Sequence, residues 1–202
     1  NCASEPEVQD LIDFLKKLGC KINQVGKRSV DVLGVEKLKS ATHKVIFDRI
    51  EAGTYIIAAA LTNGRIKIIN VEPKIMSTEI SLLNKMKVKI IKRKNYIIVK
   101  SPKRIKSINV TTKPYPGFPT DLQAQLMVLM TRADGISTIK ENIFENRFMH
   151  VSELKRMGAK IEITGNKAKI FGKSKLNGAE LMATDLRASV CLVLAGLVPP
   201  NK

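Results

Sequence analysis

The sequence is poor in the residues that build disulfide frameworks and metal sites. Its 202 residues include three cysteines, Cys2, Cys20 and Cys191, and two histidines, His43 and His150. The cysteines show no CxxC spacing and the histidines show neither HxH nor HExxH, the spacings typical of zinc and redox sites. We therefore expect free thiols, no metal site and no other cofactor.

Long apolar runs are also missing. The apolar stretches at residues 55–61 and 190–198 fall well short of the roughly 18 to 20 residues that cross a bilayer. The first residue is Asn, and no basic segment leads into an apolar run with a small-residue cleavage site. These features predict no membrane span, no membrane partner and, by default, a cytoplasmic location.

Acidic and aromatic residues are scarce. The chain has 18 Asp and Glu against 35 Lys and Arg, a formal net charge of +17, which attracts polyanions or phosphorylated small molecules. Residues 85–106 hold ten basic residues and no acidic one. Aromatic residues make up only 4% and Trp is absent, which leaves few platforms for base stacking. Charge runs are usually solvated faces, so nucleic acid is the less favoured partner.

The residues that are present form internal repeats. Three segments share a large apolar residue, a turn position and then x-Lys-Ile, namely LGCKI at 18–22, MKVKI at 86–90 and MGAKI at 157–161. Each pattern predicts the end of a helix and the start of a strand. Two short strands separated by a polar turn follow each segment, as around Gly165 and Asn166, and predict a hairpin.

The first of these segments follows an amphipathic pattern. Apolar residues recur at helical spacing at Val8, Leu11, Ile12 and Leu15. Ser4 and Glu7 are spaced as a capping box at the start of this helix, and Gly19 suits its end. Residues 1–38 therefore predict a helix followed by a hairpin.

A second element repeats in phase with the first: a short strand, an aspartate and an apolar helix. The aspartates are Asp48, Asp121 and Asp185. An acid at a helix start accepts hydrogen bonds from free backbone N–H groups, so capping alone would be enough to account for all three, and a function for any of them needs separate evidence. The helices at 50–61 and 186–197 are apolar nearly all round and are expected to be buried against sheets.

The order of these elements predicts the fold class. Residues 42–100 and 107–171 each indicate strand, helix, strand, helix, strand, strand. Residues 1–38 match the last half of such a unit, and 179–202 match the first part of another. The sequence thus predicts an α/β protein of repeated βαβαββ units, cut from a longer array.

Four segments then carry a resemblance to a known family: DRIEAGT at 48–54, FPTDLQAQ at 118–125, FENRFMHV at 144–151 and ATDLRA at 183–188. The chain resembles the enolpyruvyl transferases over essentially its whole length, and NRFMH at 146–150 favours their nucleotide-sugar branch. The resemblance implies two globular domains of the inverse α/β barrel type, with substrates in the cleft between them. Residues 1–46 would end the first domain, and 47–202 would form most of the second.

The resemblance also implies a reaction. The enolpyruvyl group of phosphoenolpyruvate would move to the 3-hydroxyl of UDP-N-acetylglucosamine with release of phosphate, the first committed step of peptidoglycan synthesis. By the resemblance, this transferase activity would serve cell wall biogenesis, cell shape and cell division. A sugar hydroxyl is a weak nucleophile and needs a positioned base. By the resemblance that base is Asp121, which follows the turn-rich residues 116–119.

The resemblance assigns the substrate contacts as well, to Thr120, Asp121, Ile143, Phe144, Arg147 and Arg187. Guanidinium groups suit carboxylates and phosphates, so the two arginines would face phosphoenolpyruvate. Ile143 and Phe144 would meet the nucleotide sugar. Asp48, Glu51 and Asp185 are expected to have structural or domain-contact roles. Residues such as Ile143 and Phe144 would otherwise be core anchors of a loop.

The family's reactive loop cysteine, a lysine and further arginines have no match here. They would lie in a missing N-terminal half of the same enzyme, so the chain alone is expected to show no turnover. Three alternatives stay open. They are the shikimate branch of the family, which acts on shikimate 3-phosphate, a basic RNA-binding protein of related fold, and a remnant that kept the fold without catalysis.

Overall fold

The structure is a computed structural model that describes residues 2–26, 28–183 and 185–198. Thr184 of the fourth motif and residues 199–202, at the end of the expected third unit, lie outside the described residues. The helices are α1 (Pro6–Lys17), α2 (Arg49–Leu61), α3 (Ser77–Lys85), α4 (Gln123–Thr131), α5 (His150–Arg156) and α6 (Leu186–Gly196), with a short 3-10 helix η1 (Thr120–Leu122) before α4. The strands are β1 (Lys21–Gln24), β2 (Val30–Leu33), β3 (Arg65–Ile69), β4 (Lys89–Lys92), β5 (Tyr96–Lys100), β6 (Asn109–Thr111), β7 (Ile136–Lys140), β8 (Lys160–Thr164) and β9 (Lys167–Phe171).

The first part of the chain is α1 followed by the antiparallel hairpin β1–β2, which confirms the predicted helix and hairpin. Gly19 follows the C-cap residue Leu18 of α1 and has a φ of +100°, a backbone conformation that favours glycine. The predicted capping box is wrong, because Glu5 precedes the helix and no side chain caps it. The Ser4 hydroxyl instead donates to the carbonyl of Tyr115 at 3.3 Å, far along the chain.

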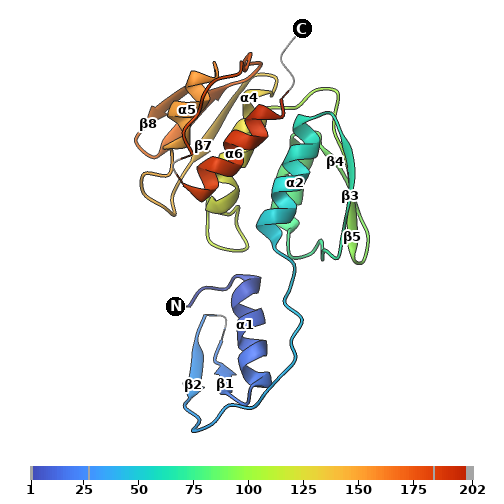
Figure 1. The fold of residues 1–202 in the computed structure, drawn as a ribbon, viewed down its shortest axis with the longest axis vertical. Helices are drawn as coiled ribbons and strands as arrows, with labels where there is room; N and C mark the ends of the chain where they lie inside the picture. Colours follow the sequence, from blue (N-terminus) through green and yellow to red (C-terminus); the bar gives the residue numbers. More distant parts are fainter. Residues whose placement is uncertain (1, 27, 184, 199–202) are drawn as a thin grey trace.

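Beyond an extended segment at residues 34–48, the described chain forms two sheets together with the helices α2 to α6 and η1 (Figure 1). One is antiparallel with the order β3-β5-β4, and the other has the order β6-β7-β9-β8 with β6 parallel to β7. The strands predicted just before Asp48 and Asp185 are not formed: residues 34–48 and 179–183 contain no strand. A strand needs a neighbour to accept its hydrogen bonds, and these segments have none among the described residues.

Helix α4 is the centre of the core. All its residues are buried, and it contacts α2, α6 and the strand β9. Because α4 is enclosed on all sides, its residues are mainly apolar, and its polar residues Gln123, Gln125 and Thr131 are buried as well. Figure 1 shows α2 beside the β3-β5-β4 sheet and α6 in front of α4. The core therefore runs continuously from one sheet to the other through α2 and α4.

The expected burial holds for most of α2, in which Glu51 and Tyr55 are exposed, and fails for one face of α6. Cys191 and Leu194 of α6 are buried, whereas Leu186 and Val193 are 71% and 66% exposed. The reason is that α6 packs on α4 and α5 with one face only. Within the described ranges, none of the helices is both long and apolar enough to traverse a membrane.

Candidate active site

Asp121 lies at the meeting point of three segments. Its Oδ1 accepts a hydrogen bond from Nη2 of Arg147 at 2.9 Å, and its Oδ2 lies 3.1 Å from Nη2 of Arg187. Arg147 comes from the loop between β7 and α5, and Arg187 from the first turn of α6. The side chains are 38%, 18% and 28% exposed for Asp121, Arg147 and Arg187. The three predicted residues thus form one half-buried charge cluster, in which guanidinium donors meet a carboxylate.

Helix capping does not explain Asp121. The 3-10 helix η1 contains this residue, and neither η1 nor α4 has a side-chain cap. Asp48, in contrast, accepts from the backbone N–H groups of Ile50 and Glu51 at 2.7 and 3.1 Å and so caps α2. Asp185 accepts from the N–H of Arg187 at 2.7 Å, as a cap of α6. Capping therefore accounts for two of the three aspartates, and the carboxylate of Asp121 is left for the arginines.

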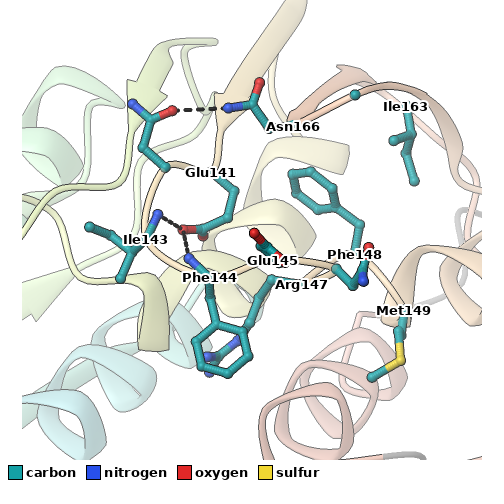
Figure 2. Close-up of a pocket in the computed structure, with 12 residues that line it drawn as sticks. Glu141, Ile143, Phe144, Glu145, Arg147, Phe148, Met149, Ile163 and Asn166 are labelled. Atoms are coloured by element: carbon teal, nitrogen blue, oxygen red, sulfur yellow. Dashed lines mark hydrogen bonds between the residues drawn. The ribbon is translucent and has the colours of Figure 1, made fainter.

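Ile143, Phe144 and Arg147 line a cavity of about 990 Å³, formed by residues 141–149 together with Ile163, Gly165 and Asn166 (Figure 2). Its volume lies at the upper end of the range typical of small-molecule sites. Ile143 and Phe144 are 43% and 60% exposed, so neither is a buried loop anchor. The guanidinium of Arg147 lies 4.8 Å from the centre of the Phe144 ring, a cation–π contact.

Arg147 connects this cavity with the charge cluster. It lines the cavity and binds Asp121, whereas Thr120, Asp121 and Arg187 are not among the lining residues. The Thr120 hydroxyl is engaged elsewhere and donates to Oε2 of Glu141 at 2.8 Å. The structure therefore brings five of the six predicted residues into two adjoining features, and it links the sixth, Thr120, to Glu141.

Glu141 was not predicted from the sequence. Its side chain is 3% exposed and accepts four hydrogen bonds, from the hydroxyls of Thr112 and Thr120 and from the backbone N–H groups of Ile143 and Phe144. Figure 2 shows the carboxylate turned back toward the amides of its own loop. The one available signal was its place in the sequence, three residues before the start of the FENRFMHV motif.

Two further titratable groups lie near the cluster. Burial lowers the pKa of His150 to about 4, with Arg147 acting in the same direction and Asp185 against it. Burial also raises the pKa of the Cys191 thiol to about 12, and Asp185 adds to the increase. Cys191 therefore stays protonated at neutral pH, which makes it a poor nucleophile. Among the residues described, no three His, Cys, Asp or Glu side chains come together in a way that could hold a metal ion.

The basic run lies apart from these features. Residues 85–106 include β4 and β5, which Figure 1 places on the far side of α2 from α6. Residues 92–94, at the turn of this hairpin, line a second cavity of about 1240 Å³ together with Lys44 and Lys74. Glu72 lies in the same lining.

Comparisons with known proteins place this arrangement in a family. Residues 1–201 match the model described as EPSP synthase (3-phosphoshikimate 1-carboxyvinyltransferase). The chain belongs to the EPSP synthase family. Its predicted resemblance to the enolpyruvyl transferases is thereby confirmed, and so is the predicted α/β fold class of these enzymes.

Relatives within the EPSP synthase family are close. The chain is 59% identical over 202 residues to a UDP-N-acetylglucosamine 1-carboxyvinyltransferase of Pelagibacter ubique, covering 100% of this chain and 48% of the relative. It is 52% identical to UDP-N-acetylglucosamine 1-carboxyvinyltransferase 1 of Caldanaerobacter subterraneus, covering 100% of this chain and 49% of that one. The chain thus spans about half the length of the curated relatives it matches.

Solved structures support the same fold. The enolpyruvyl transferase NikO from Streptomyces tendae superposes with a TM-score of 0.84 at 26% identity, over 96% of this chain and 47% of that one. EPSP synthase from Acinetobacter baumannii superposes with a TM-score of 0.67 at 20% identity, over 91% and 46% of the two chains, a likeness of fold alone.

Proposed function

We propose that this chain is half of a UDP-N-acetylglucosamine 1-carboxyvinyltransferase, acting with an N-terminal half that carries the loop cysteine. The enzyme would transfer the enolpyruvyl group of phosphoenolpyruvate to the 3-hydroxyl of UDP-N-acetylglucosamine and release phosphate. Several relatives with this name, at 51% to 59% identity over nearly all of this chain, support the proposal. The single observation that carries it is the carboxylate of Asp121 held between Arg147 and Arg187.

In this proposal Asp121 is the general base. Its carboxylate would take the proton of the sugar hydroxyl as the hydroxyl oxygen bonds to the enolpyruvyl carbon, and the phosphate leaves with the C–O bonding electrons. Arg147 and Arg187 would bind the carboxylate and phosphate of phosphoenolpyruvate. Both guanidinium groups are paired with Asp121. An incoming anion competes for those donors and so frees the carboxylate to accept the proton.

The nucleotide sugar would occupy the cavity beside Arg147. Ile143 and Phe144 present apolar surface there, which suits the face of a uridine or sugar ring. The cation–π contact with Arg147 orients the Phe144 ring before the substrate arrives. Thr120 would contact substrate only after releasing Glu141, so in this proposal it acts chiefly through that carboxylate.

The domain division and the cellular setting belong to the same proposal. Residues 1–46 would complete a first globular domain and residues 47–202 most of a second, consistent with the extended segment at 34–48. The enzyme would act in the cytoplasm at the first committed step of peptidoglycan synthesis. Its loss would then affect cell wall biogenesis, cell shape and cell division.

Titration calorimetry of the chain with UDP-N-acetylglucosamine tests the proposal. We expect saturable binding at one site, and weaker binding by Phe144→Ala than by the control Phe171→Ala, which changes the ring at the end of β9. Shikimate 3-phosphate should not compete. If RNA bound instead, and its affinity fell steeply as the salt concentration rose, the result would favour the alternative of an RNA-binding protein, which rests on the basic run at residues 85–106.

Phosphate release tests the chemistry. The chain alone should release none from the two substrates. Mixed with the part of the Pelagibacter ubique relative that it does not match, it should release phosphate, and Asp121→Asn should lower that rate by roughly 100-fold or more, the usual contribution of a general base. Equal rates for the wild-type and Asp121→Asn mixtures would contradict the role of Asp121.

A further inference from the structure

The two loops that carry the candidate site share one buried carboxylate. The segment from β6 to η1 contains Thr120 and Asp121, and the loop from β7 to α5 contains Phe144 and Arg147. Oε1 of Glu141 accepts from Thr112 Oγ1 at 2.7 Å and from the N–H groups of Ile143 and Phe144 at 2.8 and 3.1 Å. Oε2 accepts from Thr120 Oγ1 at 2.8 Å.

Glu141 is a strong hydrogen-bonding centre for physical reasons. It is 3% exposed, and burying a carboxylate is costly unless hydrogen bonds replace its hydration. Its four donors supply that replacement, and hydrogen bonds to an ionised acceptor are about twice as strong as neutral ones. The ion pairs found among the described residues do not include Glu141. Its contacts therefore fix backbone and hydroxyl positions and leave the arginines to other partners.

We propose that Glu141 is a positioning residue that sets the distance between the base-bearing segment and the arginine-bearing loop. Oε1 holds the first turn of the Arg147 loop through two backbone amides. Oε2 holds Thr120, whose neighbour Asp121 receives the guanidinium of Arg147. The side chain of Glu141 therefore positions both partners of the Asp121–Arg147 contact. The consequence for substrate binding rests on the function proposed above.

Glu141→Asp separates the two tasks of this side chain. An aspartate readily accepts from the N–H groups two and three residues ahead, so the local turn is retained. It is one methylene shorter and does not reach Thr120. We expect roughly tenfold weaker binding of UDP-N-acetylglucosamine, the size expected for losing a hydrogen bond to a charged group. The matched control is Glu162→Asp on β8, the same change on an exposed side chain, which should leave the affinity unchanged.

A double-mutant cycle identifies the coupling. Thr120→Val removes the hydroxyl and keeps the shape of the side chain. Thr120→Ser keeps the hydroxyl and should bind UDP-N-acetylglucosamine with wild-type affinity. We expect the double variant Glu141→Asp with Thr120→Val to bind about as weakly as either single variant. Losses that multiply would mean that Thr120 contacts substrate independently of Glu141, and this result would overturn the proposal.

Backbone order measured by ¹⁵N relaxation on the unliganded chain tests the same idea without a substrate. Residues 145–149 should become less ordered in Glu141→Asp and in Thr120→Val but not in Glu162→Asp. An unchanged order in both variants would refute the positioning role even if binding were altered. If the wild-type chain does not bind the nucleotide sugar, the proposed function fails, and the relaxation comparison still decides the role of Glu141.

Discussion

Replacing Arg49 by methionine is expected to destabilise the chain strongly, because it removes the counter-charge of a buried acid. Nη1 of Arg49 lies 3.1 Å from Oε1 of Glu79, whose side chain is 2% exposed. The guanidinium also binds Glu7 on α1 at 2.9 Å and lies 5.4 Å from the ring centre of Tyr115. Arg49 therefore ties α1, α2, α3 and the loop toward Asp121 together.

The magnitude follows from the burial of each partner. Breaking a buried pair by removing one side costs about 3 to 5 kcal/mol, since the remaining charge has no compensation. The bond to Glu7 adds little, because that side chain is 46% exposed and exposed pairs contribute about 1 kcal/mol or less. Arg49→Met should thus lower the free energy of unfolding by about 3 to 5 kcal/mol at pH 7. The control Arg156→Met removes an exposed partner of Glu153 and should cost about 1 kcal/mol or less.

The pH dependence of this loss has a definite sign. Burial, opposed by Arg49, raises the pKa of Glu79 above its ordinary value of 4.5. A carboxyl whose pKa is higher in the folded state destabilises the fold as the pH rises through the interval between the two pKa values. Removing Arg49 raises the pKa of Glu79 further and enlarges this penalty. The difference between wild type and Arg49→Met should therefore be largest at neutral pH and shrink toward pH 4.5.

Urea unfolding followed by circular dichroism at pH 7 and pH 4.5 measures these free energies. Adding Glu79→Gln to Arg49→Met should recover most of the loss at pH 7, because a neutral amide needs no counter-charge. A loss below about 1 kcal/mol at pH 7, or one that the second substitution does not reduce, would show that the Arg49–Glu79 contact is not a buried ion pair.

Three further predictions follow from single residues. Asp48→Ala should cost about 1 kcal/mol in the same unfolding assay, because it removes the cap of α2; an unchanged stability would mean that water replaces the cap. The pKa of His150 is lowered to about 4, so its ring should stay neutral in an NMR titration at pH 5. The fold should also lose stability as the pH falls from about 6.5 toward 4, because the imidazole of His150 binds a proton more tightly in the unfolded chain than in the folded one. Cys191, with its pKa raised to about 12, should resist a thiol reagent at pH 8 in the folded chain while Cys2 and Cys20 react; equal rates for all three would contradict its burial.

The order of helices and strands could be predicted because local signals agreed with one another. The three x-Lys-Ile segments each end a helix and begin a strand in the structure, and Gly19 and Gly158 have φ values of +100° and +98° in two of them. Hairpin turns such as Gly165 and Asn166 are likewise local chemistry. The strands expected before Asp48 and Asp185 failed because pairing is not local: a strand forms only where another segment offers its backbone groups.

The candidate site was predicted through motifs, and its supporting residues were not. Asp121, Arg147 and Arg187 lie in segments whose resemblance to a family was specific, and the structure brings them into contact. Glu141 and Arg49 acquire their importance from burial and from partners distant in the chain. A Glu or Arg in a sequence indicates neither its burial nor its distant partners, because most Glu and Arg side chains are exposed.

The three repeated aspartates show how a small backbone difference separates a carboxylate that caps a helix from one that pairs with arginines. Asp48 and Asp185 directly precede their helices, α2 and α6. In each of them a carboxylate oxygen accepts hydrogen bonding from backbone N–H in the first turn of the helix. Before α4 the chain makes the 3-10 turn η1, so Asp121 stands two residues ahead of Gln123 and does not cap the helix. Both of its oxygens face guanidinium groups instead. All three segments have the same sequence pattern, an acid followed by an apolar helix. The distinction therefore depends on the geometry of the turn η1, whose residue Thr120 donates a hydrogen bond from its hydroxyl to Glu141.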